Sequence, residues 1–189
     1  MGDRYLARAR EVGHRLADEG IRLVYGGGSV GLMGAMADAC LSAGGEVVGV
    51  ITKKLLELEV GHVGCQELIV VETMLERKTR MAELSDAFLS LPGGIGTLDE
   101  LLEMLTSSQL DIHQKPSGLL NVDGFYDGFL AFLEKVQCEG FVRPEHLGML
   151  MAAERVEDVI EKLRAYQPVA VAKWVNQGAA NQAANQADH

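Results

Sequence analysis

Short apolar runs and longer amphipathic segments alternate along this chain. The short runs are apolar on both faces, which is typical of strands in a sheet that helices cover on each side. The longer segments repeat apolar residues every third or fourth position, as amphipathic helices do. Residues 52–66 fit neither pattern. The pattern predicts strands at residues 21–25, 46–51, 67–72, 87–91 and 117–122, and helices at residues 4–19, 30–43, 74–85, 97–109, 126–138 and 155–165.

Strands that alternate with helices predict an α/β fold with a doubly wound parallel sheet flanked by helices. The length of 189 residues suits one domain, which we place at residues 1–167. Its last part, VNQGAANQAANQADH, is low in complexity and rich in Ala, Asn and Gln. We therefore expect residues 168–189 to form a disordered tail.

Composition excludes several classes of function. A net charge of −10 argues against binding of nucleic acid, which needs a basic face. The three cysteines form no CxxC pair and favour a reducing, cytoplasmic setting over a disulfide scaffold. No apolar run approaches the roughly 20 residues of a membrane span. The polar start, MGDRYLARAR, is unlike a signal peptide.

The first glycine cluster, YGGGSVGLMG (25–34), follows a predicted strand. Ligands of open parallel sheets bind at the carboxyl ends of the strands. Gly26, Gly28 and Gly31 have the spacing of a dinucleotide fingerprint, and Gly27 and Gly28 are candidates for a phosphate loop. No acidic residue stands where a ribose contact is expected. A tight turn between strand and helix explains the glycines equally well.

The second cluster, LPGGIGTLDE (91–100), also follows a predicted strand. Gly93, Gly94 and Gly96 leave backbone N–H groups that can face an anion. Thr97 and Glu100 have the spacing of a capping box, and this spacing alone slightly favours capping over ligand binding. The two roles are compatible, because both place Glu100 at the carboxyl edge of the sheet. The neighbouring Asp99 suits a solvated position in the first turn.

A third candidate is the arginine in TMLERKTRM (73–81). Arg77 falls on one helical stripe with Met74, Met81 and Leu84, so we expect it to face inward. A buried guanidinium needs an anionic partner, either a ligand or a structural carboxylate. The histidines have no common metal-ligand spacing, so surface or capping roles are expected and no metal site is predicted.

Together these segments resemble the LONELY GUY (LOG) family of cytokinin riboside 5′-monophosphate phosphoribohydrolases. The resemblance rests on GGGSVGLMG (26–34), MLERK (74–78), PGGIGTLDE (92–100) and QLDIHQKPSGLLNVDGFYD (109–127), and extends over about residues 3–165. The RK dipeptide followed by PGGxGTxxE is its most specific part. Related bacterial sequences carry the label "possible lysine decarboxylase", but no motif here supports pyridoxal phosphate chemistry.

The resemblance implies a Rossmann-like homodimer with active sites near the subunit interface and no cofactor. It implies hydrolysis of the N-glycosidic bond of an adenosine-type 5′-monophosphate. Arg77 and Glu100 match the family's catalytic residues. The implied substrate contacts are Glu59, Arg77, Lys78, Gly94, Ile95, Gly96, Thr97, Leu98, Asp99, Glu100 and Thr106.

The chain departs from the family pattern in two places. The family usually begins with a strand and a Gly-Ser loop, whereas this chain begins at the helix that follows them. We therefore expect an incomplete sheet and the loss of one wall of the phosphate pocket. The family often has an aromatic residue after Thr106, where this chain has Ser107 and Ser108.

These observations favour a hydrolase in which Glu100 stabilises an oxocarbenium-like transition state and Arg77 fixes ribose or phosphate. The alternative is a non-catalytic nucleotide-binding or molybdenum-cofactor carrier protein of the same fold. The Arg77 and Glu100 pair within the full signature favours the enzyme.

Overall fold

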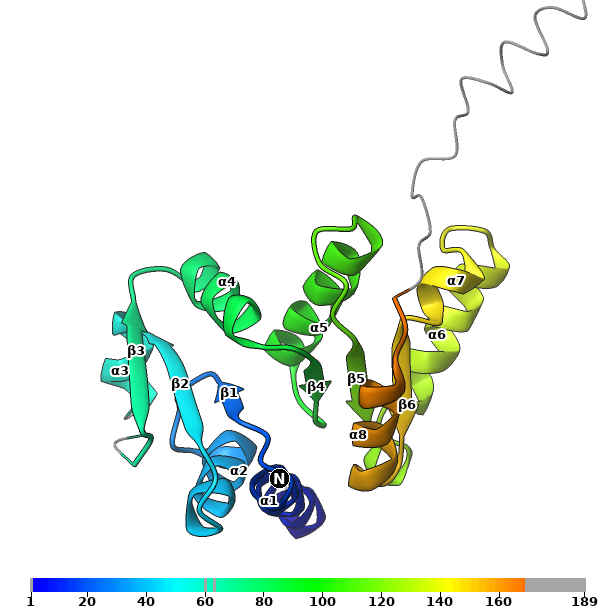
Figure 1. Ribbon diagram of the computed structural model, residues 1–189. Helices are drawn as coiled ribbons and strands as arrows, with labels where there is room; N and C mark the ends of the chain where they lie inside the picture. Colours follow the sequence, from blue (N-terminus) through cyan, green and yellow to red (C-terminus); the bar gives the residue numbers. More distant parts are fainter. Residues whose placement is uncertain (1, 60, 63, 169–189) are drawn as a thin grey trace, which may run out of the picture.

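The computed structural model describes residues 2–59, 61–62 and 64–168. Short strands alternate with helices along the chain (Figure 1). The strands are β1 (Leu23–Tyr25), β2 (Val47–Thr52), β3 (Glu67–Val71), β4 (Phe88–Ser90), β5 (Ser117–Leu120) and β6 (Leu150–Ala153). The helices are α1 (Asp3–Asp18), α2 (Gly31–Ser42), α3 (Lys53–Glu59), α4 (Met74–Leu84), α5 (Ile95–Gln109), α6 (Asp127–Cys138), α7 (Pro144–Leu147) and α8 (Val156–Ala165), with a 3-10 turn, η1 (Val122–Gly124).

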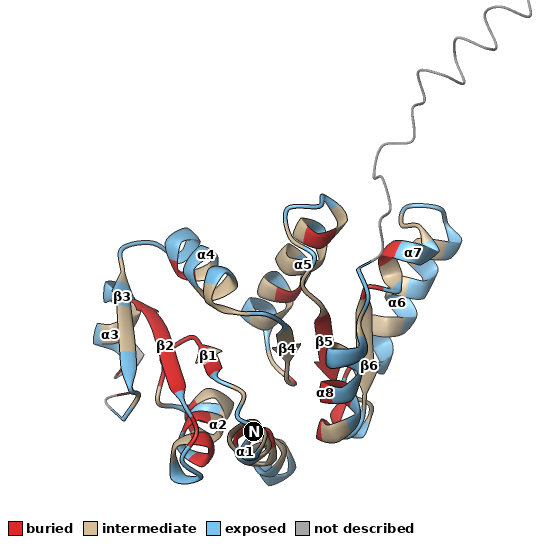
Figure 2. Cartoon of the chain, viewed as in Figure 1, coloured by how far each residue is buried: buried red, intermediate tan, exposed pale blue. Residues whose placement is uncertain are grey.

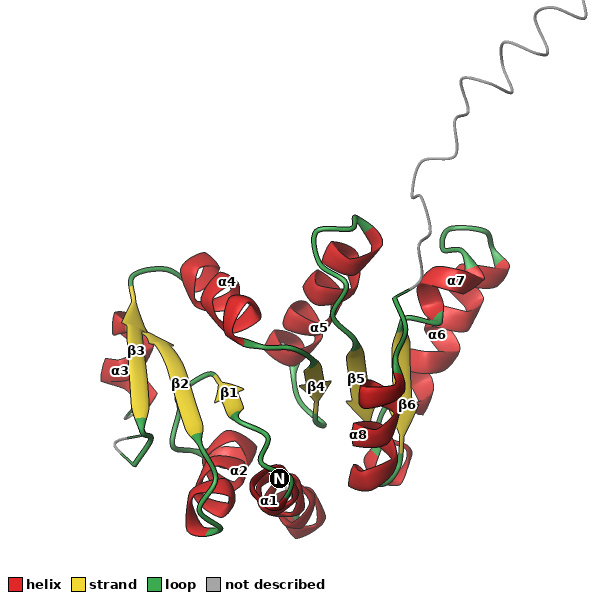
Figure 3. Ribbon diagram, in the orientation of Figure 1, coloured by secondary structure: helices red, strands yellow, loops and turns green. Residues whose placement is uncertain are grey.

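The strands form two parallel three-stranded sheets, in the orders β1-β2-β3 and β4-β5-β6 (Figure 3). Leu23 pairs with Val47 in the first sheet, and Phe88 pairs with Ser117 in the second. The predicted α/β fold with parallel strands and flanking helices is confirmed. The described pairings leave β1 and β4 each bonded on one side only.

The strands β1 and β4 face each other with the same polarity. Near their amino ends, the Arg22 guanidinium donates to the Leu84 carbonyl at 3.5 Å. Beyond their carboxyl ends, Arg77 reaches both the Gly26 carbonyl and the Glu100 carboxylate. The two sheets thus share one carboxyl edge, where ligands bind in this class of fold.

Helices cover both sides of the sheets and create the core. In Figure 1, α4 and α5 lie above the strands and α1 and α2 below them. The helix α1 contacts α2 and α8, so Val12 of α1 packs with Leu120 of β5 and Val159 of α8. The central strands β2 and β5 are buried along their whole length (Figure 2). Near-continuous apolar runs such as Val47–Thr52 form strands because both of their faces are covered.

All predicted strands and helices are present, with ends shifted by one or two residues. Besides the turn η1, two helices and one strand were not predicted. Part of the unassigned segment 52–66 forms α3, and α7 and β6 lie between the last two predicted helices. The predicted tail, apart from Pro168, lies outside the described residues.

Candidate active site

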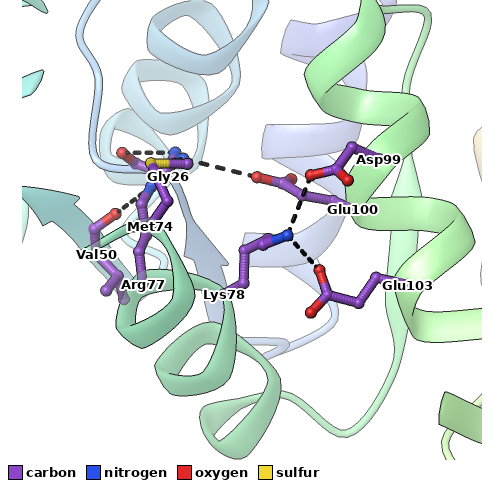
Figure 4. Close-up of polar contacts among 8 residues, drawn as sticks. All are labelled: Gly26, Val50, Met74, Arg77, Lys78, Asp99, Glu100 and Glu103. Carbon is purple, nitrogen blue, oxygen red and sulfur yellow. Dashed lines mark hydrogen bonds and ion pairs between the residues drawn. The ribbon is translucent and has the colours of Figure 1, made fainter.

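Arg77 is held at the shared carboxyl edge by its own helix and by two backbone carbonyls. A capping box fixes the start of α4, because the Glu76 N–H donates to Thr73 Oγ1 at 3.1 Å and the Glu76 carboxylate accepts from the Thr73 N–H. Arg77 lies one residue further along and is buried. Its Nε donates to the Val50 carbonyl at 3.0 Å and its Nη2 to the Gly26 carbonyl at 3.2 Å (Figure 4).

Gly26 provides the space that the guanidinium occupies. A Cβ atom on Gly26 would lie 1.9 Å from Nη2 of Arg77, far inside any permitted contact. A side chain at this position would therefore displace the guanidinium of Arg77 from its two carbonyl partners. The sequence analysis explained the glycines of residues 25–34 by phosphate binding or by a tight turn. The close approach of an arginine is a different explanation, which the sequence analysis did not include.

Glu100 faces Arg77 from the second turn of α5. Its Oε1 lies 3.6 Å from Nη1 of Arg77, which joins the two sheets by an ion pair (Figure 4). Burial raises the pKa of the Glu100 carboxyl, while the charges of Arg77 and Lys78 oppose this increase. The inward-facing arginine predicted from the sequence therefore has a carboxylate partner, and that partner is the glutamate of the glycine motif.

The capping box predicted at Thr97 and Glu100 is wrong. The helix α5 begins at Ile95, two residues earlier than predicted, and Gly94 is its N-cap with no side-chain hydrogen bond. Thr97 and Glu100 are consequently inside the helix. The Thr97 side chain instead packs over Gly93, where a Cβ atom would lie 2.1 Å from Oγ1. The carboxylate of Glu100 is thus not needed to end the helix.

Lys78 lies next to the ion pair of Arg77 and Glu100, and its ammonium contacts two acidic side chains. Its Nζ lies 3.1 Å from Asp99 Oδ2 and 2.5 Å from Glu103 Oε2. Hydrogen bonds to Glu103 and then Asp99 raise the pKa of the lysine. Asp99 is exposed as expected, although it lies beyond the first turn of α5. Glu103 was missed by the sequence analysis, but its spacing of three residues from Glu100 indicates the same helical face.

Arg77 and Glu100 line a cavity of about 1000 Å³ between β1 and β4. Gly96 and Thr97 line the same end of this cavity. Around both Gly94 and Gly96, a Cβ atom would meet no heavy atom within 4 Å. These two glycines are therefore not required by packing within the chain, unlike Gly26 and Gly93. They leave the backbone of the first turn open to a ligand.

The other predicted site residues lie away from this cavity. Gly27 and Gly28 are buried beneath the segment at Gly61 and His62, because Gly28 bridges to Gly61 and the His62 N–H donates to the Gly27 carbonyl. Leu98 packs its side chain into the core with Leu101. Ile95 is 83% exposed, and Thr106 is exposed further along α5. Glu59 ends α3, and its side chain lies outside the described part.

Two other expectations from the sequence need correction. Met74, placed on the inward stripe with Arg77, is exposed. Arg77, Met81 and Leu84 of that stripe line the cavity. The histidines were expected at the surface or at caps, but His62 and His146 are buried. His62 contacts Asp38 at 2.9 Å.

Two further kinds of feature, a metal site and a membrane-spanning helix, are absent from the described residues. These residues contain no group of three or more His, Cys, Asp or Glu side chains placed to hold a metal ion. None of their helices has the length and apolar character needed to cross a membrane.

The chain is similar to known proteins over most of its length. Residues 33–163 match a family described as "Possible lysine decarboxylase". The cytokinin riboside 5′-monophosphate phosphoribohydrolase LOG of Oryza sativa subsp. japonica is 48% identical over 164 residues, covering 87% of this chain and 68% of that protein. LOG5 of Arabidopsis thaliana, with the same named activity, is 44% identical over 165 residues, covering 87% and 72%.

Solved structures share the fold at lower identity. The molybdenum cofactor binding protein of Rippkaea orientalis aligns with a TM-score of 0.66 and 23% identity, covering 87% of this chain and 88% of that one. The molybdenum cofactor carrier protein of Chlamydomonas reinhardtii gives 0.64 and 22%, covering 88% and 91%. The fold is thus a Rossmann-type α/β fold. Within it, the chain belongs to the LOG family, the family that is also described as possible lysine decarboxylases.

Proposed function

We propose that this protein is a phosphoribohydrolase that cleaves the N-glycosidic bond of cytokinin riboside 5′-monophosphates, AMP or both. The products are the free cytokinin or adenine and ribose 5-phosphate. One observation carries the proposal: the buried Arg77 holds Glu100 at the carboxyl edge of the sheets, on the wall of a cavity. The relatives' named activity supports it.

Glu100 has the chemistry that this reaction needs. The bond between C1′ and the base nitrogen breaks through an oxocarbenium-like state. A carboxylate next to C1′ stabilises that positive charge and accepts a proton from the attacking water. The water oxygen then bonds to C1′, and the base leaves with the bond's electron pair and gains a proton. The raised pKa of Glu100 makes it a better proton acceptor than an ordinary glutamate.

Arg77 keeps this carboxylate in place and ionised. Two backbone carbonyls hold Nε and Nη2, so the guanidinium is fixed before substrate binds. Nη1 remains directed at Glu100 at 3.6 Å. Nη1 carries two N–H groups, so it can also donate to a ribose or phosphate oxygen that lies beside the ion pair.

The start of α5 supplies a site for the 5′-phosphate. Gly94 and Gly96 have open space above them, and N–H groups at a helix start attract anions. A phosphate there, with C1′ near Glu100, makes a nucleoside 5′-monophosphate a better substrate than its nucleoside. No metal ion or organic cofactor is part of this proposal.

A decarboxylase that uses pyridoxal phosphate fits the site poorly. Such enzymes hold the cofactor through a lysine whose amine is easily deprotonated. Lys78 is the lysine beside Arg77 and Glu100, and Glu103 and Asp99 raise its pKa. Its ammonium is therefore stabilised rather than prepared for Schiff-base formation.

The carrier interpretation is also less favoured. The likeness to the molybdenum cofactor carriers is below 25% identity and supports the fold alone. A carboxylate on the wall of an anion-binding cavity repels a phosphate ligand, so Glu100 weakens simple carriage. The Glu100 carboxylate instead favours a reaction in which positive charge develops at C1′.

The proposal includes a homodimer in the cytoplasm. Exposed apolar side chains lie on α4 and α5 beside the site, at Leu75, Ile95 and Leu102. Exposed apolar side chains that form one patch mark an interface, so these residues are the place where we expect the partner subunit. Thr106 is one turn from Leu102, so it can contact a substrate held by the partner. The three cysteines are free thiols, as in reducing compartments.

The test is to incubate the purified protein with AMP and with isopentenyladenosine 5′-monophosphate and follow base release by chromatography. The two nucleosides serve as matched controls without the phosphate. The proposal predicts base release from a monophosphate and little from the nucleosides. A nucleotide that binds tightly and stays intact would instead support the carrier.

A further inference from the structure

The segment NVDGFYD, residues 121–127, follows β5 and has no part in the site described above. It forms the turn η1 and leads into α6. Asp123 and Gly124 have positive φ angles of 50° and 73°, so the chain bends sharply after β5. The bend brings Tyr126 to the loop between β4 and α5, where its hydroxyl donates to the Leu91 carbonyl at 2.6 Å. The paired strands β4 and β5 are thus linked a second time beyond their carboxyl ends.

Tyr126 is held in one position by its surroundings. Its N–H donates to Asn121 Oδ1 at 2.7 Å, and Asn121 Nδ2 donates to Asp127 Oδ1 at 2.8 Å. Its ring packs with Leu101 of α5 and Leu119 of β5, and the residue is 1% exposed. Burial raises the pKa of the Tyr126 phenol to about 12, so the hydroxyl keeps its proton at neutral pH. The hydroxyl is therefore a fixed donor directed at the loop.

The Leu91 carbonyl lies at the start of the glycine turn, residues 91–96. The strand β4 ends at Ser90, and this carbonyl belongs to the peptide that joins Leu91 to Pro92. That peptide is planar, and the proline ring fixes the φ angle that follows it. The direction of the carbonyl therefore also sets the direction in which the chain enters Gly93. Pro92 has no N–H of its own with which to hold the turn.

The other end of the glycine turn is the start of α5. Gly94 is the N-cap of this helix and has no side-chain hydrogen bond. The backbone hydrogen bonds of the helix begin with the Leu98 N–H, which donates to the Gly94 carbonyl at 3.2 Å. The N–H groups of Ile95, Gly96 and Thr97 precede it and are the ones that a helix start offers to an anion. Glycine gives the backbone much freedom, so an anchor at the start of the turn restricts how these N–H groups are arranged.

We propose that Tyr126 is a positioning residue that raises the affinity of the site for a phosphate group, through the Leu91 carbonyl and the glycine turn. The inference rests on the proposed function, because that function places the 5′-phosphate at the start of α5. Without the hydroxyl, the Leu91 carbonyl loses its partner and the turn is no longer anchored at its start. The N–H groups must then be ordered when the ligand binds, which weakens binding. Arg77 and Glu100 carry out the chemistry at C1′, so the effect falls on binding rather than on the chemical step.

The test is Tyr126→Phe, which removes the hydroxyl and keeps the ring that packs on α5. Calorimetry measures the binding of ribose 5-phosphate, and base release measures KM and kcat for the better of the two monophosphates. We expect the Kd of ribose 5-phosphate and the KM each to rise about tenfold, the effect of one lost hydrogen bond. The kcat value and the acidic limb of kcat/KM should stay in place, because Arg77 and Glu100 are unchanged. Tyr5→Phe is the matched control, since its hydroxyl accepts from the exposed Arg4 at 3.0 Å, and it should leave all of these values unchanged.

The two measurements separate this role of Tyr126 from the proposed function. An unchanged Kd and KM in Tyr126→Phe overturn the role, even if the melting temperature falls, because the hydroxyl then contributes to stability alone. A loss confined to kcat, or an unmodified protein that binds no ribose 5-phosphate at millimolar concentration, overturns it as well. A protein that releases no base from either monophosphate contradicts the proposed function instead. In that case the Kd of ribose 5-phosphate, compared between the unmodified protein and Tyr126→Phe, still decides the role of Tyr126.

Discussion

At the scale of residues, the site depends on one arginine whose guanidinium contacts both backbone carbonyls of the fold and the candidate catalytic glutamate. Two nitrogens of Arg77 bind the carbonyls of Gly26 and Val50, and the third faces Glu100. The sequence could indicate that Arg77 faces inward and needs an anion, since it lies on an otherwise apolar stripe. The sequence could not indicate that Arg77 binds the Val50 carbonyl. Every residue has a backbone carbonyl, and only the folded structure determines which one lies next to the arginine.

The first prediction concerns the pH dependence. Burial raises the pKa of Glu100, so activity that needs its carboxylate should decline on acidification at a higher pH than an ordinary glutamate would give. Arg77 lowers that pKa, and Arg77→Gln removes the effect. We expect the acidic limb of kcat/KM to move to higher pH, together with a loss of turnover of roughly 10².

The control is Arg80→Gln, which removes an exposed arginine of the same helix that pairs with Glu83. Its pH profile should match that of the unmodified protein. An acidic limb that stays in place or moves to lower pH in Arg77→Gln would show that Glu100 is not the group that titrates.

The second prediction concerns Gly26. Gly26→Ala places a methyl group 1.9 Å from the original position of Arg77 Nη2, so the guanidinium must move. We expect turnover to fall by roughly 10², as when a positioned catalytic group is removed. Gly128→Ala is the control, because a Cβ atom there meets nothing within 4 Å. Normal turnover in Gly26→Ala would show that the position of Arg77 is unimportant.

At the scale of elements, local sequence signals were sufficient where they act within one helix. They placed α4 within one residue, and its start has a side-chain cap at Thr73. Local signals did not predict the elements whose conformation depends on contacts between residues distant in the sequence. The strand β6 consists of Leu150–Ala153, residues that favour helices, and it is a strand because it pairs with β5. The helix α5 begins before its Thr97, since Gly94 can serve as N-cap in an extended conformation.

The third prediction tests the cap of α4. Thr73→Ala removes the hydroxyl that accepts from the Glu76 N–H and should lower the free energy of unfolding by about 1 kcal/mol. Thr79→Ala removes a hydroxyl from an exposed position inside the same helix and should have a near-neutral effect. Urea unfolding of both variants measures the difference. Equal stabilities would show that the capping box contributes nothing.

At the scale of the whole molecule, the sheet is divided and α1 spans the two halves. The sequence predicted one parallel sheet with a missing strand, and the structure has two sheets with the cavity between β1 and β4. Apolar patterning identified the strands. It did not fix the partner of each strand, because strands buried on both faces look alike in sequence.

The fourth prediction follows from the packing of α1. Val12 is fully buried between α1, β5 and α8, so Val12→Ala should lower the free energy of unfolding by about 2 kcal/mol. Val30→Ala, at a residue that is 57% exposed, should change it little. Unfolding in urea followed by circular dichroism compares them. A Val12→Ala protein as stable as the Val30→Ala protein would mean that α1 does not hold the halves together.

The most direct test of the proposed function is the rate of base release from AMP and from isopentenyladenosine 5′-monophosphate by the unmodified protein and by Glu100→Gln. Glu83→Gln, an exposed glutamate of α4, is the control. The proposal predicts that Glu100→Gln lowers turnover by roughly 10² or more while the folded structure is kept. The Glu83→Gln protein should keep its rate. Near-normal turnover in Glu100→Gln would contradict the catalytic role of the pair that Arg77 and Glu100 form.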